Sequence, residues 1–95
     1  MTWLSWHDGF QLQRHRLGGL DELRLGRDAS QCTLVAPPGA TAVSRVHAVV
    51  AMRQGAWWIR DLSSQGTILN GLPINSSGSK LRPGDELDLA GWLVA

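Results

Sequence analysis

Short apolar runs, separated by glycine and proline, make up most of the chain and predict strands rather than helices. Gly or Pro interrupts the sequence about every 8 to 15 residues, a spacing typical of all-β sandwiches and barrels. We find no convincing helical pattern and no internal repeat. Strands are expected over residues 10–17, 21–27, 32–36, 46–52, 56–62, 67–69, 73–75 and 92–95, and in 80–90, which a Pro83–Gly84 turn divides.

Alternation within these runs predicts which side chains face inward. Successive residues of a strand point to opposite faces, so Leu23 and Leu25 share one face. In residues 56–62, Trp58 and Arg60 are expected opposite Trp57 and Ile59. The run 10–17 alternates at its start and indicates a strand with one solvated face.

Tight turns join some of the strands. Asn70–Gly71 is a strong signal for a two-residue hairpin, and residues 53–55 indicate another tight connection. About nine or ten short strands are predicted, which indicates an all-β fold of two packed sheets.

Polar residues gather in three loops, 26–31, 41–45 and 63–67, together with Asn70, and loops on a rigid scaffold commonly carry function.

Composition and charge narrow the function. The chain has 95 residues, with 43% hydrophobic and 18% charged residues, so we expect one globular domain over 1–95. Eight Arg and one Lys against eight acidic residues give a net charge of +1, far below that of a general nucleic-acid binder. Any anion recognition must therefore be local, and Arg suits phosphate or carboxylate.

The sequence carries few signals for the location of the protein in the cell. Cys32 is the single cysteine, so an internal disulfide is excluded, and a reducing, cytoplasmic location is expected. The first residues do not have the pattern of a signal peptide, and no run is long enough to span a membrane, so we expect neither a secretion signal nor membrane insertion by this domain. The apolar end of the chain suggests a domain excised from the N-terminus of a longer protein.

Catalysis and metal binding find little support in the residue pattern. Ser44 and His47 could form a nucleophile and a base, but residues three apart on a strand face opposite sides, and no G-x-S-x-G is present. The three histidines are scattered without metal-ligand spacing. We therefore expect no metal, no cofactor and no enzymatic activity, and large aromatic residues in a small β-domain are more often core than base-stacking platforms.

Several short blocks in order resemble the forkhead-associated (FHA) domain family. These are "LGR" (25–27), "SRVH" (44–47), "DLSSQGT" (61–67), "NG" (70–71) and "LRPGDELDL" (81–89). The resemblance covers about residues 20–90 and implies a twisted two-sheet β-sandwich of the FHA/SMAD type with binding loops at one end. It also implies recognition of phosphothreonine in peptides, and not an enzyme.

The resemblance assigns roles to individual residues. Arg27 is expected to be the principal phosphate ligand, with Ser44 donating a hydroxyl and Arg45 adding a second positive contact. His47 is expected to brace the loops without touching phosphate. The remaining expected peptide-binding residues are Ser64, Gln65 and Asn70, and the remaining loop-supporting residues are Gly26, Gly66, Thr67 and Gly71.

The run "DLSSQGT" departs from the family pattern D-L-x-S-x-N-G-T by being one residue shorter. Gln65 stands where Asn is usual, and Ser64 stands where the family often has a phosphate-facing Thr. The sequence thus predicts a module that binds a phosphothreonine protein, in trans or on the parent chain, after a Ser/Thr kinase has acted. The alternative is a phosphate-independent FHA-like scaffold in a membrane-associated bacterial secretion assembly.

Overall fold

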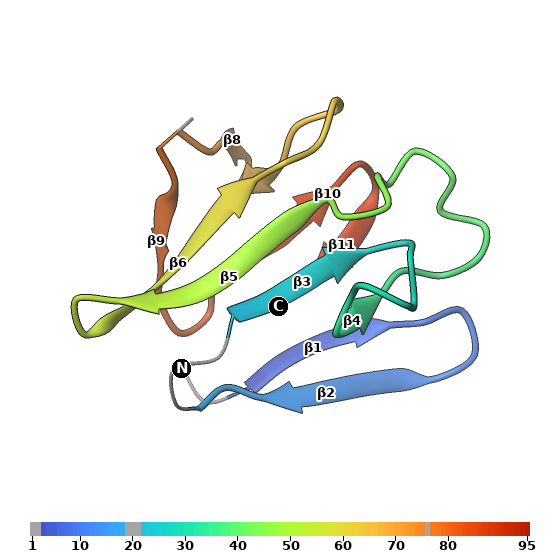
Figure 1. The fold of residues 1–95 in the computed structure, drawn as a ribbon, viewed down its shortest axis with the longest axis horizontal. Coiled ribbons are helices and arrows are strands. Elements are labelled where there is room, and N and C mark those ends of the chain that lie inside the picture. Colours follow the sequence, from blue (N-terminus) through green and yellow to red (C-terminus); the bar gives the residue numbers. More distant parts are fainter. Residues whose placement is uncertain (1–2, 19–21, 76) are drawn as a thin grey trace.

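Eleven strands in two sheets form the regular structure of the residues that the structure describes (Figure 1). The computed structural model describes residues 3–18, 22–75 and 77–95, and within these ranges it contains no helix, so none that could cross a membrane. The strands are β1 (Trp3–His7), β2 (Leu12–Arg16), β3 (Glu22–Gly26), β4 (Leu34–Val35), β5 (Ala48–Arg53), β6 (Ala56–Asp61), β7 (Ile68–Leu69), β8 (Leu72–Pro73), β9 (Ser79–Leu81), β10 (Leu87–Leu89) and β11 (Trp92–Val94).

The two sheets pack face to face around one apolar core, which confirms the predicted all-β sandwich. One sheet has six strands in the order β2-β1-β11-β10-β7-β8, and the other has five in the order β4-β3-β5-β6-β9. Inward positions follow the two-residue period of the strands. The core side chains of β1, β10 and β11 are Leu4, Trp6, Leu87, Leu89, Trp92 and Val94, and those of β3, β5, β6 and β9 are Leu23, Leu25, Ala48, Val50, Trp57, Ile59 and Leu81.

The N-terminal hairpin differs most from the sequence-based expectation. Strand β1 was not predicted, although Leu4 and Trp6 alternate and are both buried. Strand β2 is shorter than the predicted 10–17, and its face with Leu12 is exposed because that residue pairs with the outward-facing His7. The alternation of 10–17 therefore indicated a strand correctly, but Phe10 and Leu12 are exposed, and Leu17, which follows β2, is the buried apolar residue of the run.

Three hairpins of the described residues are closed by two-residue turns: the β10–β11 hairpin, around Ala90–Gly91, and the two that were predicted. Arg53 pairs with Ala56 around Gln54–Gly55, and Leu69 pairs with Leu72 around Asn70–Gly71. Both turn residues have positive φ in each case, 51° and 78° in the first and 50° and 83° in the second. This is the backbone of a type I′ turn, which matches the twist of the strands and favours Asn and Gly.

One rung of the five-stranded sheet brings the functional loops to the same end of the sandwich. Leu25 on β3 pairs with Ala48 on β5, and Ala48 pairs with Asp61 on β6. Because these strands are antiparallel, β3 and β6 end where β5 begins. The segments that follow Leu25, precede Ala48 and follow Asp61 therefore lie side by side (Figure 1).

Candidate functional site

Gly26 is in close contact with the loop that precedes β5. Its φ is not in the left-handed region, so the requirement for glycine is one of space. A Cβ at this position would overlap the carbonyl oxygen of Arg45 and lie 2.9 Å from that of Ser44. The glycine of the "GR" block is thus needed because two loop residues pass directly over it.

Backbone hydrogen bonds join the Arg27 segment to the Ser44 segment. The Arg27 N–H donates to the Ser44 carbonyl at 3.1 Å, and the Asp28 N–H donates to the Arg45 carbonyl at 3.1 Å. The Arg27 Nε also donates to the Val43 carbonyl, which orients the side chain along the loop. Arg27 is exposed, and its terminal guanidinium nitrogens make none of the hydrogen bonds or ion pairs within the described residues.

His47 links the second loop to the third. It is fully buried, its Nδ1 accepts a hydrogen bond from the Ser44 N–H at 3.1 Å, and its Nε2 lies 2.9 Å from the Gly66 carbonyl oxygen. Because Nδ1 accepts and the carbonyl can only accept, the neutral ring with its proton on Nε2 satisfies both contacts. A catalytic role for the Ser44–His47 pair receives no support, since the ring contacts the Ser44 backbone and not its hydroxyl.

Asp61 organises the third loop from the end of β6. Its Oδ1 accepts hydrogen bonds from the Ser63 hydroxyl at 2.6 Å and the Thr67 hydroxyl at 2.8 Å. The Ser63 Oγ in turn accepts from the Gly66 N–H at 2.7 Å. Burial raises the pKa of Asp61, but the hydrogen bonds from Ser63 and Thr67 outweigh it, and the pKa lies below its ordinary value.

This network explains two of the loop-supporting residues predicted from the sequence. Thr67 is buried, with 3% of its surface exposed, and its hydroxyl bonds to Asp61. Gly66 has a positive φ of 88°, which favours glycine, and presents its carbonyl to His47. The shortened loop is therefore held by the hydrogen bonds of Asp61 and Ser63 and by the contact of His47 with the Gly66 carbonyl.

The polar groups predicted to meet a ligand project from these braced loops. Arg45 and Ser64 are exposed, Gln65 is exposed, and Ser44 is half-buried. Within the described residues, no hydrogen bond or ion pair uses the side chain of any of these four. Together with Arg27 they form a set of polar groups on loops that are fixed by backbone hydrogen bonds. Their side chains remain available to a ligand.

Asn70 is not brought to this set. It follows β7 and lies at the far end of the β7–β8 hairpin from Thr67. Its Nδ2 donates to the Asp85 carboxylate at 2.9 Å, and its Oδ1 accepts from the Glu86 N–H at 2.9 Å. These contacts tie the hairpin turn to the start of β10, so Asn70 and Gly71 shape the far end of the sandwich.

The roles of Asp61 and Ser63 were missed in the sequence. Both belong to the "DLSSQGT" block, and an Asp followed two residues later by Ser is a pattern that commonly forms a local side-chain turn. The same motif recurs at Asp28, whose carboxylate accepts from the Ser30 N–H and hydroxyl. The hydrogen bonds of the Ser30 and Gln31 side chains lower the pKa of Asp28.

A sequence profile of the FHA domain matches residues 23–90, which is most of the chain. The chain belongs to the FHA domain family. Domains of this family are interaction modules and not enzymes, and the matched range contains every residue of the site described above.

Solved FHA domains share the fold across nearly the whole length. The FHA domain of the CT664 protein from Chlamydia trachomatis superimposes with a TM-score of 0.83 at 22% identity, covering 97% of this chain and 91% of that one. An FHA domain solved in a study of phosphothreonine-dependent FHA interactions gives 0.80 at 22% identity, covering 99% and 93%.

A third solved structure is EmbR from Mycobacterium tuberculosis in complex with a low-affinity phosphopeptide. It gives a TM-score of 0.77 at 25% identity and covers 99% of this chain and 24% of EmbR. A search of curated protein sequences finds no match. The structural comparisons establish the shared fold of this FHA domain.

Proposed function

We propose that this FHA domain binds peptide segments that carry phosphothreonine. The observation that supports it most is the pair of exposed arginines, Arg27 and Arg45, on adjacent hydrogen-bonded loops with no carboxylate partner within the described residues. Hydroxyl groups of Ser44 and Ser64 stand on the same loop end with free hydrogen-bonding capacity. A phosphate dianion is matched by such a combination of guanidinium and hydroxyl donors.

Each residue has a distinct part in this proposal. Arg27 is the principal phosphate ligand, Ser44 and Ser64 donate hydroxyl hydrogen bonds, and Arg45 adds a second positive charge. Gln65 holds the peptide main chain. Asn70 is left out of the ligand contacts, because its amide already bonds to Asp85 and Glu86 at the far end of the β7–β8 hairpin.

The comparisons support the ligand class without defining the partner. One structural neighbour comes from work on phosphothreonine-dependent FHA interactions, and another is bound to a phosphopeptide. We propose that a Ser/Thr kinase supplies the modification, on a separate protein or on another segment of the parent chain, in the cytoplasm. The domain then assembles its partners only after phosphorylation.

The test is a titration with a degenerate phosphothreonine peptide library and its unphosphorylated twin. We expect binding of the phosphorylated library alone, and the Arg27→Ala variant should weaken it about ten-fold or more, because a hydrogen bond to a charged group is worth about 1.5–3 kcal/mol. Arg24→Ala is the matched control. Arg24 lies on β3, three residues before Arg27, and points to the outer sheet face near Glu22, so its loss should leave affinity unchanged.

Two further outcomes decide between readings of the site. Equal binding of both libraries, or none, overturns phosphate recognition and favours a phosphate-independent scaffold. Binding that survives Arg27→Ala overturns the assignment of the principal ligand alone. Affinity should also fall as the pH drops through about 6, where the phosphate gains its second proton and loses a charge.

A further inference from the structure

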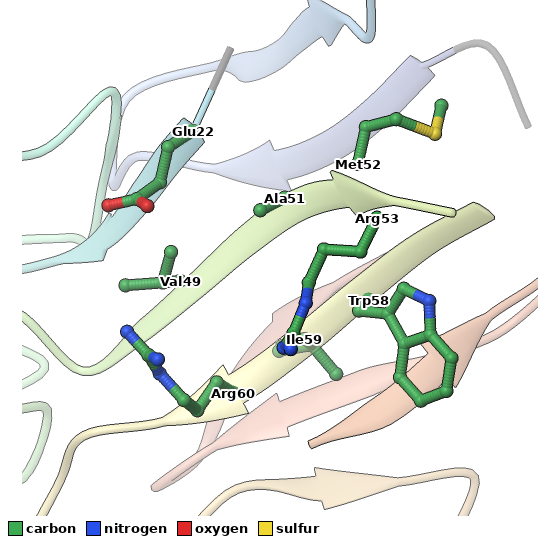
Figure 2. A pocket seen from close by; sticks show the side chains of 8 residues that line it. All are labelled: Glu22, Val49, Ala51, Met52, Arg53, Trp58, Ile59 and Arg60. Carbon is green, nitrogen blue, oxygen red and sulfur yellow. The ribbon is translucent and has the colours of Figure 1, made fainter. Parts of the chain in front are cut away.

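The outer face of the five-stranded sheet carries a hollow of about 340 Å³ along β5 (Figure 2). Its floor consists of the short side chains of Val49 and Ala51. Figure 2 shows these two between Glu22 on β3 and the long side chains of Arg60 and Trp58 on β6. We call this hollow the β5 groove.

Strand register, rather than loop conformation, sets the walls of the β5 groove. Val49 pairs with Arg60, and Ala51 pairs with Trp58, so each small residue lies directly beside a large one on the same face. Directly opposite residues in a sheet have Cβ atoms about 5 Å apart. The hollow is therefore built on paired strands and not on a loop.

Positive charge is concentrated around the β5 groove. Four of the nine Lys and Arg residues of the chain point to this sheet face, and Glu22 is the acidic residue that the described strands place there. The four are Arg24, Arg53, Arg60 and Lys80. Glu22 lies 3.8 Å from Arg24, and no other ion pair forms within the described residues, so Arg53, Arg60 and Lys80 have no carboxylate partner there. A chain with a net charge of +1 thus has a local surplus on this face.

Trp58 adds an apolar anchor point. It points outward but is only partly exposed, and its ring forms one wall of the hollow. Its indole N–H is buried and finds no acceptor within the described residues. Trp and Arg are the residue types that dominate binding energy at protein interfaces, and here both kinds surround an apolar floor.

We propose that the β5 groove binds an extended acidic peptide segment, in which an aromatic or aliphatic residue is flanked by aspartate or glutamate. The apolar residue packs on Ala51 against Trp58, and the carboxylates bond to Arg53 and Arg60. Charge complementarity selects this occupant, because the floor accepts apolar side chains of any protein but the unpaired cations favour a negative one. This surface is separate from the loop end and does not require phosphate.

The test is an NMR titration of the intact domain with a short blocked peptide that has a central phenylalanine flanked on both sides by aspartate and glutamate. We expect shifts of the β5 and β6 amides and of the Trp58 indole N–H, and none with a twin peptide that has lysine for every acid. The double variant Arg53→Glu, Arg60→Glu should weaken binding at least about ten-fold, since two attractive pairs become repulsive.

The matched control is Arg14→Glu, Arg16→Glu, which makes the same change of charge on exposed positions of β2 in the other sheet. It should leave affinity within about two-fold, and thermal unfolding confirms that both double variants remain folded. The proposal is overturned if the acidic peptide shifts no resonances, or shifts those of the Arg27 and Ser44 loops instead of those of β5 and β6. It is also overturned if both double variants weaken binding equally. Concentration-dependent shifts of β5 without peptide would identify a second copy of the chain as the occupant and overturn it as well.

Discussion

The two ends of the sandwich are held together in different ways. At the far end, the Gln54–Gly55 turn is fixed by its own residues, which adopt positive φ between directly paired strand ends, and the Asn70–Gly71 turn has in addition the contacts of Asn70 to Asp85 and Glu86. At the loop end, the contacts that join one loop of the candidate site to another link residues distant in sequence. Arg27 bonds to the Val43 carbonyl sixteen residues away, and His47 contacts Gly66 nineteen residues away.

Because of this difference, substitutions at the two ends should affect stability and ligand binding differently. A far-end substitution disturbs a turn and its immediate contacts, and its effect should not reach the ligand groups. A loop-end substitution disturbs a contact shared by two or three loop segments. It should therefore displace ligand-binding side chains that it does not itself contact. The comparison predicts that affinity responds to buried loop-end residues and not to far-end ones, even where the loss of stability is similar.

The largest effect is expected from Gly26→Ala. The added methyl would overlap the Arg45 carbonyl, so the whole segment over it must shift. We expect a loss of about 2–3 kcal/mol in the free energy of unfolding, as for other overpacked sites, and loss of measurable phosphopeptide binding. Urea unfolding and peptide titration measure the two effects.

Gly39→Ala is the matched control for that substitution. Gly39 lies in the connection between β4 and β5, has no positive φ, and has nothing within 4 Å of its added Cβ. It should leave both stability and affinity unchanged. Retained affinity in Gly26→Ala would show that the Ser44 loop can shift without consequence and would remove the distinction between the two ends.

An intermediate effect is expected from Asp61→Asn. Ionised Asp61 accepts from two hydroxyl groups, and its loss should cost about 1–2 kcal/mol at neutral pH and weaken binding several-fold through Ser64. Its folded pKa lies below the ordinary 3.8, so its contribution is complete above about pH 4 and disappears as the pH falls through the folded value.

The pH dependence of unfolding isolates this contribution. Asp8 and Asp28 also have lowered pKa values, and both remain in the variant, so the difference between the two curves belongs to Asp61. The difference should shrink below about pH 4. A constant difference across the acid range would show that the Asp61 carboxylate is not what holds the third loop.

The smallest effect is expected from Asn70→Gly. Glycine keeps the positive φ of the turn and removes only the amide contacts to Asp85 and Glu86. We expect a loss of about 1 kcal/mol in the free energy of unfolding and no change in phosphopeptide affinity. A ten-fold loss of affinity would return Asn70 to the ligand site, where the family resemblance first placed it.

The sequence predicted the elements that depend on neighbouring residues. Alternation placed Leu23, Leu25, Trp57 and Ile59 on the buried faces, and Asn70–Gly71 marked a hairpin. It did not predict that the apolar side of β2 would face solvent. That orientation depends on pairing with β1, a contact between strands that the alternation of one strand alone does not determine.

The candidate site was predicted only in part. The family blocks predicted a loop end with Arg27, Ser44 and His47, and the structure places all three there. The reason for Gly26 was not visible in the sequence, because the carbonyls that pass over it belong to residues eighteen and nineteen positions later. The closure of the shortened loop by Asp61 was likewise missed, and Asn70 lies elsewhere because its amide is used at the far end.

The β5–β6 hairpin connects the loop end to the β5 groove in one rigid piece. From His47 to Arg53 the chain rises about 20 Å, at about 3.3 Å per residue of strand. A partner with a phosphothreonine and an acidic segment at least about six extended residues apart would span both surfaces at once. Its second contact would then form at a high effective concentration, so two weak sites would give avidity beyond either alone.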